Sequence, residues 1–121
     1  MSTKKTVVLG ASENPSRYSN LAVKKLTAFR HPVIAIGKKS GKIGDTPILT
    51  AKDHHDDIDT VTLYLNPDHQ KAWYDYILSL HPRRIIFNPG AENDELFELA
   101  QKKGIMAQEA CTLVLLSTGQ Y

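Results

Sequence analysis

The sequence has one cysteine among its 121 residues, Cys111, so it cannot form an internal disulfide. This is typical of a reducing compartment, and we expect a cytoplasmic location. No apolar run approaches the roughly 18–20 residues that cross a membrane. The run Val7–Leu9 is also far shorter than the roughly 7–15 apolar residues of a signal peptide. We interpret it as the first strand and expect no membrane partner.

An excess of charge of one sign is also lacking, because 15 Lys and Arg residues face 13 Asp and Glu residues and the net charge is +2. The basic residues are scattered, whereas a nucleic-acid surface needs a basic patch, so we expect no nucleic-acid partner. The length and the 41% hydrophobic content suit one domain with its own core, over residues 1–121. No feature marks an interface, which leaves the oligomeric state open.

Short runs rich in β-branched and aromatic residues recur along the chain. The expected strands are Thr6–Leu9, Val33–Ile36, Thr60–Leu65, Arg84–Phe87 and Ile105–Gln108. Continuous apolar runs of this kind are typical of parallel strands buried on both faces. They alternate with helical patterns, and this order predicts an α/β, three-layer, Rossmann-like fold with about five parallel strands.

Apolar residues at helical spacing predict the helices Ser19–Phe29, Pro67–Leu80 and Asn93–Lys103. In the first helix, Ala22, Leu26 and Phe29 share one face. The second carries an apolar stripe that consists of Ala72, Trp73, Tyr76, Ile77 and Leu80. Because Trp73 and Tyr76 lie on this stripe, core packing is favoured over base stacking for these aromatic residues.

Two segments are harder to assign. Residues Lys38–Asp57 are rich in turn-forming residues, and we expect one short extended piece there, at Thr46–Thr50. The apolar run Cys111–Leu116 has no clear period, so a helix and a strand both stay open.

Small, turn-forming or hydrogen-bonding residues follow four of the expected strands: Gly10-Ala11-Ser12, Gly37-Lys38-Lys39, Asn66-Pro67 and Asn88-Pro89-Gly90. In an open parallel sheet a ligand binds beyond these carboxyl ends. Such residues also suit strand–helix turns that bind nothing. Because all four ends share the pattern, we favour a ligand site, in which N–H groups near Ser19 hold phosphate oxygens and Ser12, Arg17 and Ser19 add donors.

The end of the second strand distinguishes between nucleotide ligands. NAD sites usually place an acidic residue there to bind the ribose hydroxyls. This chain has Lys38 and Lys39 instead, and the full G-x-G-x-x-G pattern is absent after Gly10. An adenosine ligand with a ribose phosphate, either coenzyme A or NADP, therefore fits better than NAD.

Four stretches resemble a known family: VVLGASENPSRYSN, TLYLNP, RRIIFNPGAEN and EACTLVLLSTGQY. Together they look like the small stand-alone CoA-binding domain proteins, which are related to the nucleotide-binding N-terminal domain of the succinyl-CoA synthetase α subunit. The resemblance implies a Rossmann-type CoA-binding fold. Our leading interpretation is therefore a module that binds coenzyme A or an acyl-CoA without catalysis of its own. The synthetase's phosphohistidine lies in a second domain, so none of the five histidines of this chain inherits that role.

The resemblance also implies a set of binding residues. The first-loop motif expected to hold the diphosphate matches Gly10, Ala11, Ser12, Pro15, Arg17, Tyr18 and Ser19. Lys38 matches a basic position near the ribose phosphate, Asn66 and Pro67 a turn beside the adenine, and Asn88, Pro89 and Gly90 a turn along the pantetheine. Many relatives have Asn-Pro where this chain has Gly37-Lys38.

Other candidate chemistry is weaker. His54 and His55 lie among aspartates, but adjacent loop residues usually point apart, so we expect a solvated loop and no metal. Cys111 is either a buried small hydrophobe or a thiol that exchanges disulfides with coenzyme A. We assign no catalytic residue. Two further hypotheses stay open: a small NADP-dependent reductase, and an interaction protein that keeps the fold while its ligand site has lapsed.

Overall fold

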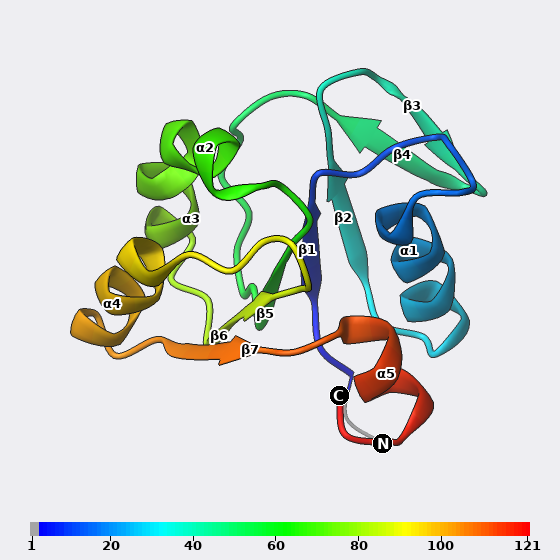
Figure 1. Ribbon diagram of the computed structural model, residues 1–121. Helices are drawn as coiled ribbons and strands as arrows, with labels where there is room; N and C mark the ends of the chain where they lie inside the picture. Colours follow the sequence, from blue (N-terminus) through cyan, green and yellow to red (C-terminus); the bar gives the residue numbers. More distant parts are fainter. Residues whose placement is uncertain (1–2) are drawn as a thin grey trace.

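A seven-stranded sheet forms the centre of the molecule (Figure 1). The computed structural model describes residues 3–121. The strands are β1 (Thr6–Leu9), β2 (Val33–Ile36), β3 (Gly41–Ile43), β4 (Thr46–Leu49), β5 (Thr60–Leu63), β6 (Arg84–Phe87) and β7 (Met106–Glu109). Their order across the sheet is β3-β4-β2-β1-β5-β6-β7, and every neighbouring pair is parallel except β3–β4.

Helices cover both faces of the sheet, which confirms the three-layer Rossmann-like fold. On one face lie α1 (Tyr18–Ala28) and α5 (Thr112–Ser117). On the other lie α2 (Pro67–Gln70), η1 (Lys71–Trp73), α3 (Tyr74–Ser79) and α4 (Asp94–Lys102) (Figure 1). Among residues 3–121, no helix is long and apolar enough to cross a membrane.

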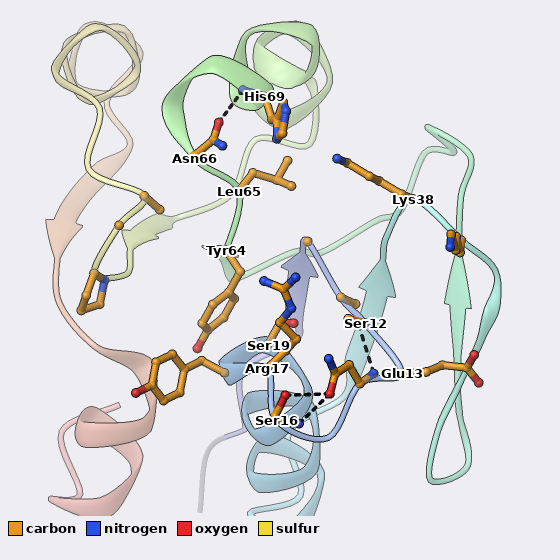
Figure 2. Close-up of a pocket in the computed structure, with 18 residues that line it drawn as sticks. Ser12, Glu13, Ser16, Arg17, Ser19, Lys38, Tyr64, Leu65, Asn66 and His69 are labelled. Carbon is orange, nitrogen blue, oxygen red and sulfur yellow. Dashed lines mark hydrogen bonds between the residues drawn. The ribbon is translucent and has the colours of Figure 1, made fainter.

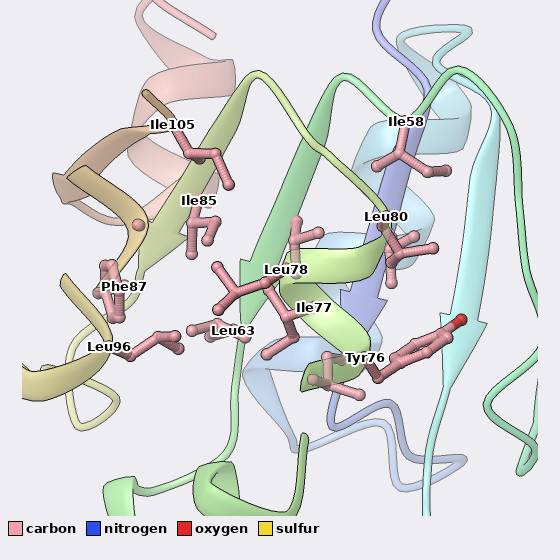
Figure 3. Packing of buried hydrophobic residues seen from close by; sticks show 14 of the residues in the cluster. Ile58, Leu63, Tyr76, Ile77, Leu78, Leu80, Ile85, Phe87, Leu96 and Ile105 are labelled. Atoms are coloured by element: carbon pink, nitrogen blue, oxygen red, sulfur yellow. The ribbon is translucent and has the colours of Figure 1, made fainter. Parts of the chain in front are cut away.

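The core consists of two hydrophobic clusters, one on each face of the sheet. The α3/α4 cluster includes Leu63, Ile77, Phe87 and Leu96 (Figure 3). The α1/α5 cluster includes Val8, Val23, Leu26, Ile48 and Leu116. Strand β1 contributes to both, because alternate side chains of a strand point to opposite faces. Strands β1, β5 and β6 are buried along their whole length, as expected from their continuous apolar runs.

The sheet has seven strands where about five were expected, because the extended piece at Thr46–Thr50 joins it as β4 and because β3 was not predicted. Strand β3 contains only three residues, and a single one of them, Ile43, is buried. It pairs antiparallel with β4, the extended piece expected at Thr46–Thr50, through the two-residue turn Gly44-Asp45. Gly44 has a φ of +59°, which two-residue hairpin turns with glycine first require. The hairpin therefore adds two strands, β3 and β4, to the five that were expected.

Two expected helices differ in detail. The predicted helix Pro67–Leu80 is divided into α2, η1 and α3, and this break leaves Ala72 exposed although Tyr76, Ile77 and Leu80 are buried. In α1, Val23 is buried, whereas Phe29 lies just past the helix end and is 45% exposed. The run at Cys111–Leu116, which the sequence left open, forms α5.

Candidate functional site

A cavity of about 840 Å³ lies at the carboxyl ends of the central strands (Figure 2). The strand order reverses here, because β2 lies on one side of β1 in the sheet and β5 lies on the other. This is the switch point at which open α/β sheets bind ligands. A smaller cavity of about 250 Å³ adjoins it, and the two share Gly10, Lys38, Leu65 and His69.

The loop that follows β1 is pressed against the end of β2. The N–H groups of Gly10 and Ala11 both donate to the carbonyl oxygen of Ile36, at 2.8 and 2.9 Å. Gly10 has a φ of +103°, which glycine adopts at no steric cost. A Cβ on Gly37 would lie 2.3 Å from the carbonyl oxygen of Ala11. Glycine at both positions therefore allows the loop to bridge the two strand ends.

Side chains within the loop hold its shape without a ligand. The N–H of Asn14 donates to Ser12 Oγ at 3.1 Å, and Asn14 Oδ1 accepts from the Ser16 N–H and hydroxyl at 3.0 and 2.8 Å. Asn20, which is buried in α1, donates from Nδ2 to the Ser12 carbonyl oxygen at 2.9 Å. The loop is thus preorganised, and this lowers the entropic cost of binding an anion.

Helix α1 begins at the wall of the larger cavity, with Tyr18 and Ser19 among the lining residues. Arg17 is the N-cap residue in extended conformation, and its side chain does not cap the helix. The first N–H groups of a helix have no partner within the helix, and the helix dipole makes this end favourable for anions. The start of α1 can therefore receive phosphate oxygens.

The charges around the larger cavity favour a negatively charged ligand. Arg17, Lys38 and Lys39 line it. Of the described residues that line it, one is acidic. This residue, Glu13, points toward β3, where its Oε2 accepts from the Lys42 N–H at 3.0 Å (Figure 2). Glu13 therefore connects the loop to the β3–β4 hairpin, and its charge is partly compensated by a backbone donor.

The opposite wall is formed by the turn after β5. Asn66 caps α2, because its Oδ1 accepts from the His69 N–H at 3.0 Å. The Tyr64 hydroxyl is buried beside Thr62 and Thr112 but makes no hydrogen bond of normal geometry within residues 3–121. Burial, and then the neighbouring Cys111, raise the pKa of Tyr64 well above its usual value. The phenol therefore stays neutral near pH 7.

A buried glutamine ties two walls of the larger cavity together. Gln70 Nε2 donates to the carbonyl oxygens of Leu65 and Ala91, both at 2.8 Å. Its Oε1 accepts from Asn93 Nδ2 at 2.9 Å, and Gln70 is 0% exposed. Because Leu65 follows β5 and Ala91 follows β6, this one side chain fixes the spacing of the two turns.

Asn88 has a structural role rather than a place in the cavity wall. Its Nδ2 donates to Thr62 Oγ1 at 2.6 Å and to the Leu63 carbonyl oxygen at 2.9 Å, and its Oδ1 accepts from the Thr112 N–H at 2.9 Å. It joins β5, β6 and α5, and the two residues that follow it, Pro89 and Gly90, reach the cavity.

The structure brings most of the predicted site residues to the larger cavity. Those that line it are Gly10, Ala11, Ser12, Arg17, Tyr18, Ser19, Lys38, Asn66, Pro89 and Gly90. Pro15, Pro67 and Asn88 do not line it. Pro15 is exposed in the loop, and Pro67 is the first residue of α2, where proline suits a helix start.

Several lining residues were not predicted: Glu13, Asn14, Ser16, Tyr64, Leu65, His69 and Ala91; Lys39 was noted only for its charge. Tyr64 and Leu65 were assigned to a strand, but β5 ends at Leu63, so both leave the sheet and reach the cavity. The pair Asn66-Pro67 gave the signal for this turn. Asn at a helix start and Pro at the first helical position place His69 in the first turn of α2, beside the site.

The remaining candidates lie elsewhere. His54 and Asp56 form an exposed pair at 2.7 Å, and no three His, Cys, Asp or Glu side chains within residues 3–121 are grouped to hold a metal. Cys111 is half-buried, just before α5, and lines neither cavity.

Comparison with known proteins supports this architecture. Residues 4–117 match the family model described as CoA binding domain. The crystal structure of an uncharacterized protein is 44% identical, covers 100% of both chains and has a TM-score of 0.97. A hypothetical protein from Pyrococcus horikoshii OT3 is 20% identical over 96% of this chain and 83% of its own, with a TM-score of 0.86. No curated protein matches the sequence.

The same fold occurs in part of a larger enzyme. The dinucleotide-forming acetyl-coenzyme A synthetase 1 of Ca. Korarchaeum cryptofilum, solved with phosphate and ADP, is 17% identical over 87% of this chain and 25% of its own, with a TM-score of 0.70. The chain described here belongs to the CoA binding domain family, which confirms the resemblance seen in the sequence.

Proposed function

We propose that this protein binds coenzyme A or an acyl-CoA in the larger and smaller cavities, without a catalytic step of its own. The observation that carries the proposal is the geometry of the switch point. There, a preorganised loop and a helix start lie at one side of a continuous cavity, and Lys38 lies at the junction with the smaller one. Membership of the CoA binding domain family supports the same ligand.

Each part of the ligand has a matching region in this proposal. The diphosphate lies against the loop Ser12–Ser19, which includes Arg17 and leads into the first turn of α1. The adenine enters the smaller cavity between Leu65, Trp73 and Ile36. Lys38, at the junction, takes the ribose phosphate. The pantetheine runs past Tyr64 toward Pro89 and Gly90.

Calorimetric titration with coenzyme A, dephospho-CoA and NADP tests the proposal. We expect coenzyme A to bind about tenfold more tightly than dephospho-CoA, which corresponds to about 1.4 kcal/mol for one phosphate contact. Lys38→Met should reduce the affinity for coenzyme A to about that for dephospho-CoA. Lys103→Met is the matched control, because Lys103 is an exposed residue just past α4 and lines neither cavity.

The three ligands also distinguish the alternatives. Tighter binding of NADP than of coenzyme A would favour the reductase hypothesis. Absence of both heat and thermal stabilisation with all three ligands would contradict the proposal and favour an interaction protein. Equal binding of coenzyme A and dephospho-CoA would support the binding function but would show that Lys38 does not bind the ribose phosphate.

A further inference from the structure

Lys38 and His69 face each other where the two cavities join. Both residues line both cavities, and Figure 2 shows the ammonium end of Lys38 directed across the gap toward the His69 imidazole. They come from different elements, since Lys38 follows β2 and His69 lies in α2. The backbone N–H of His69 donates to Asn66 Oδ1, which caps α2 and fixes its first turn beside the junction. The His69 side chain is exposed, so the imidazole is accessible to a ligand.

We propose that His69 and Lys38 together bind the ribose phosphate of the ligand, and that protonation of His69 strengthens this contact. This inference rests on the function proposed above. A phosphate monoester carries a charge of about −1.5 to −2 at pH 7. One ammonium group neutralises only part of that charge. A histidine opposite the lysine can supply the second positive charge, and the bound phosphate in turn favours the charged imidazole.

The charged groups around this junction define the pH dependence. Asp68, beside His69 on α2, lines the smaller cavity. Arg17, Lys39 and Glu13 line the larger one, and the Glu13 carboxylate accepts from the Lys42 N–H on β3. Lys52 lines neither cavity, but its Nζ lies 4.8 Å from the centre of the Trp73 ring, which lines the smaller one. Aspartate, glutamate, lysine and arginine ordinarily keep their charges between pH 6 and pH 8, whereas histidine changes its charge in this range. The affinity for the phosphate should therefore rise as the pH falls.

The test is the ratio of the dissociation constants for dephospho-CoA and coenzyme A, measured by calorimetry at pH 7.5 and pH 6.0. This ratio isolates the ribose phosphate, because the rest of the ligand is the same. For the wild type we expect the ratio to increase about threefold to tenfold at pH 6.0, a change of about 0.7–1.4 kcal/mol. His69→Gln should abolish the increase or reverse it, because the phosphate itself gains a proton near pH 6.

Two further variants sharpen the result. His69→Lys places a fixed positive charge at the junction, so its ratio should be high at pH 7.5 and should not increase at pH 6.0. His54→Gln is the matched control, because His54 is exposed and lines neither cavity, and it should behave as the wild type. Far-UV circular dichroism of each variant checks that the fold is retained.

The outcomes separate this inference from the proposed function. If His69→Gln shows the same increase as the wild type, or the wild type shows none, coenzyme A still binds but His69 does not hold its phosphate. If neither coenzyme A nor dephospho-CoA binds the wild type at either pH, the proposed function is wrong, and this inference falls with it.

Discussion

The surroundings of His31 favour its neutral form. Its Nδ1 accepts a hydrogen bond from the Lys4 N–H at 2.9 Å, which a protonated Nδ1 could not do. Its ring packs edge-on against Tyr121, with centroids 5.0 Å apart. Burial lowers the pKa of His31, and the positive charges of Lys4 and Arg84 lower it further, while Asp59 opposes them. Protonation of this residue therefore destabilises the folded state.

The pH dependence of folding follows from this shift. In the unfolded chain His31 has its ordinary pKa of about 6.5, whereas in the folded chain its pKa is lower, so the unfolded chain binds the proton more readily. The free energy of unfolding should therefore decrease as the pH falls below about 6.5. His31→Asn keeps an oxygen acceptor for the Lys4 N–H but cannot titrate. Urea denaturation at pH 7.5, 6.5 and 5.5 should show a shallower decrease for this variant, and parallel curves for the two proteins would contradict the prediction.

Among the helices and strands, the connection between the β5 and β6 turns depends on Gln70. Gln70→Met has a similar volume but removes three hydrogen bonds, which leaves the carbonyl oxygens of Leu65 and Ala91 and the Asn93 amide short of partners. Each such buried group costs about 1–3 kcal/mol, in part relieved by relaxation. We expect the free energy of unfolding to decrease by about 2–4 kcal/mol. The affinity for coenzyme A should also decrease, because both turns line the larger cavity.

Urea denaturation and calorimetry measure the two effects of Gln70→Met. Gln101→Met, on the exposed side of α4, is the control and should stay within about 0.5 kcal/mol of the wild type. A loss of stability without any loss of affinity would show that the two turns keep their positions without Gln70.

The sequence pattern predicted elements well where one physical signal dominates. Strands β1, β2 and β6 have the expected bounds, because continuous apolar runs suit a sheet covered on both faces. The hairpin strand β3 has no such run, because it is a three-residue edge strand in which Ile43 alone is buried. The residues that follow the strands also located the cavity, because a ligand of an open parallel sheet binds beyond the carboxyl ends of its strands. These residues could not show that the Asn88 side chain points toward Thr62 and Thr112, because its orientation depends on contacts with residues far away in the sequence.

At the scale of the whole molecule, the two hydrophobic clusters share one sheet. In β1, Val7 and Leu9 belong to the α3/α4 cluster, and Val8 belongs to the α1/α5 cluster. Neither face can lose its packing without exposing a strand that the other face also needs. We therefore expect both faces to unfold in one cooperative transition, as most single domains of this size do.

The single tryptophan makes this testable. Trp73 packs against the α3/α4 cluster, whereas Leu26 is fully buried in the α1/α5 cluster. Leu26→Ala should lower the free energy of unfolding by about 2–5 kcal/mol, through lost burial and a cavity. If the faces are coupled, urea denaturation followed by Trp73 fluorescence and by far-UV circular dichroism should shift to the same midpoint. Leu21→Ala, on the exposed side of α1, should shift neither signal by much. An unchanged Trp73 transition beside a two-step dichroism curve would show that the α3/α4 face holds its structure without the other.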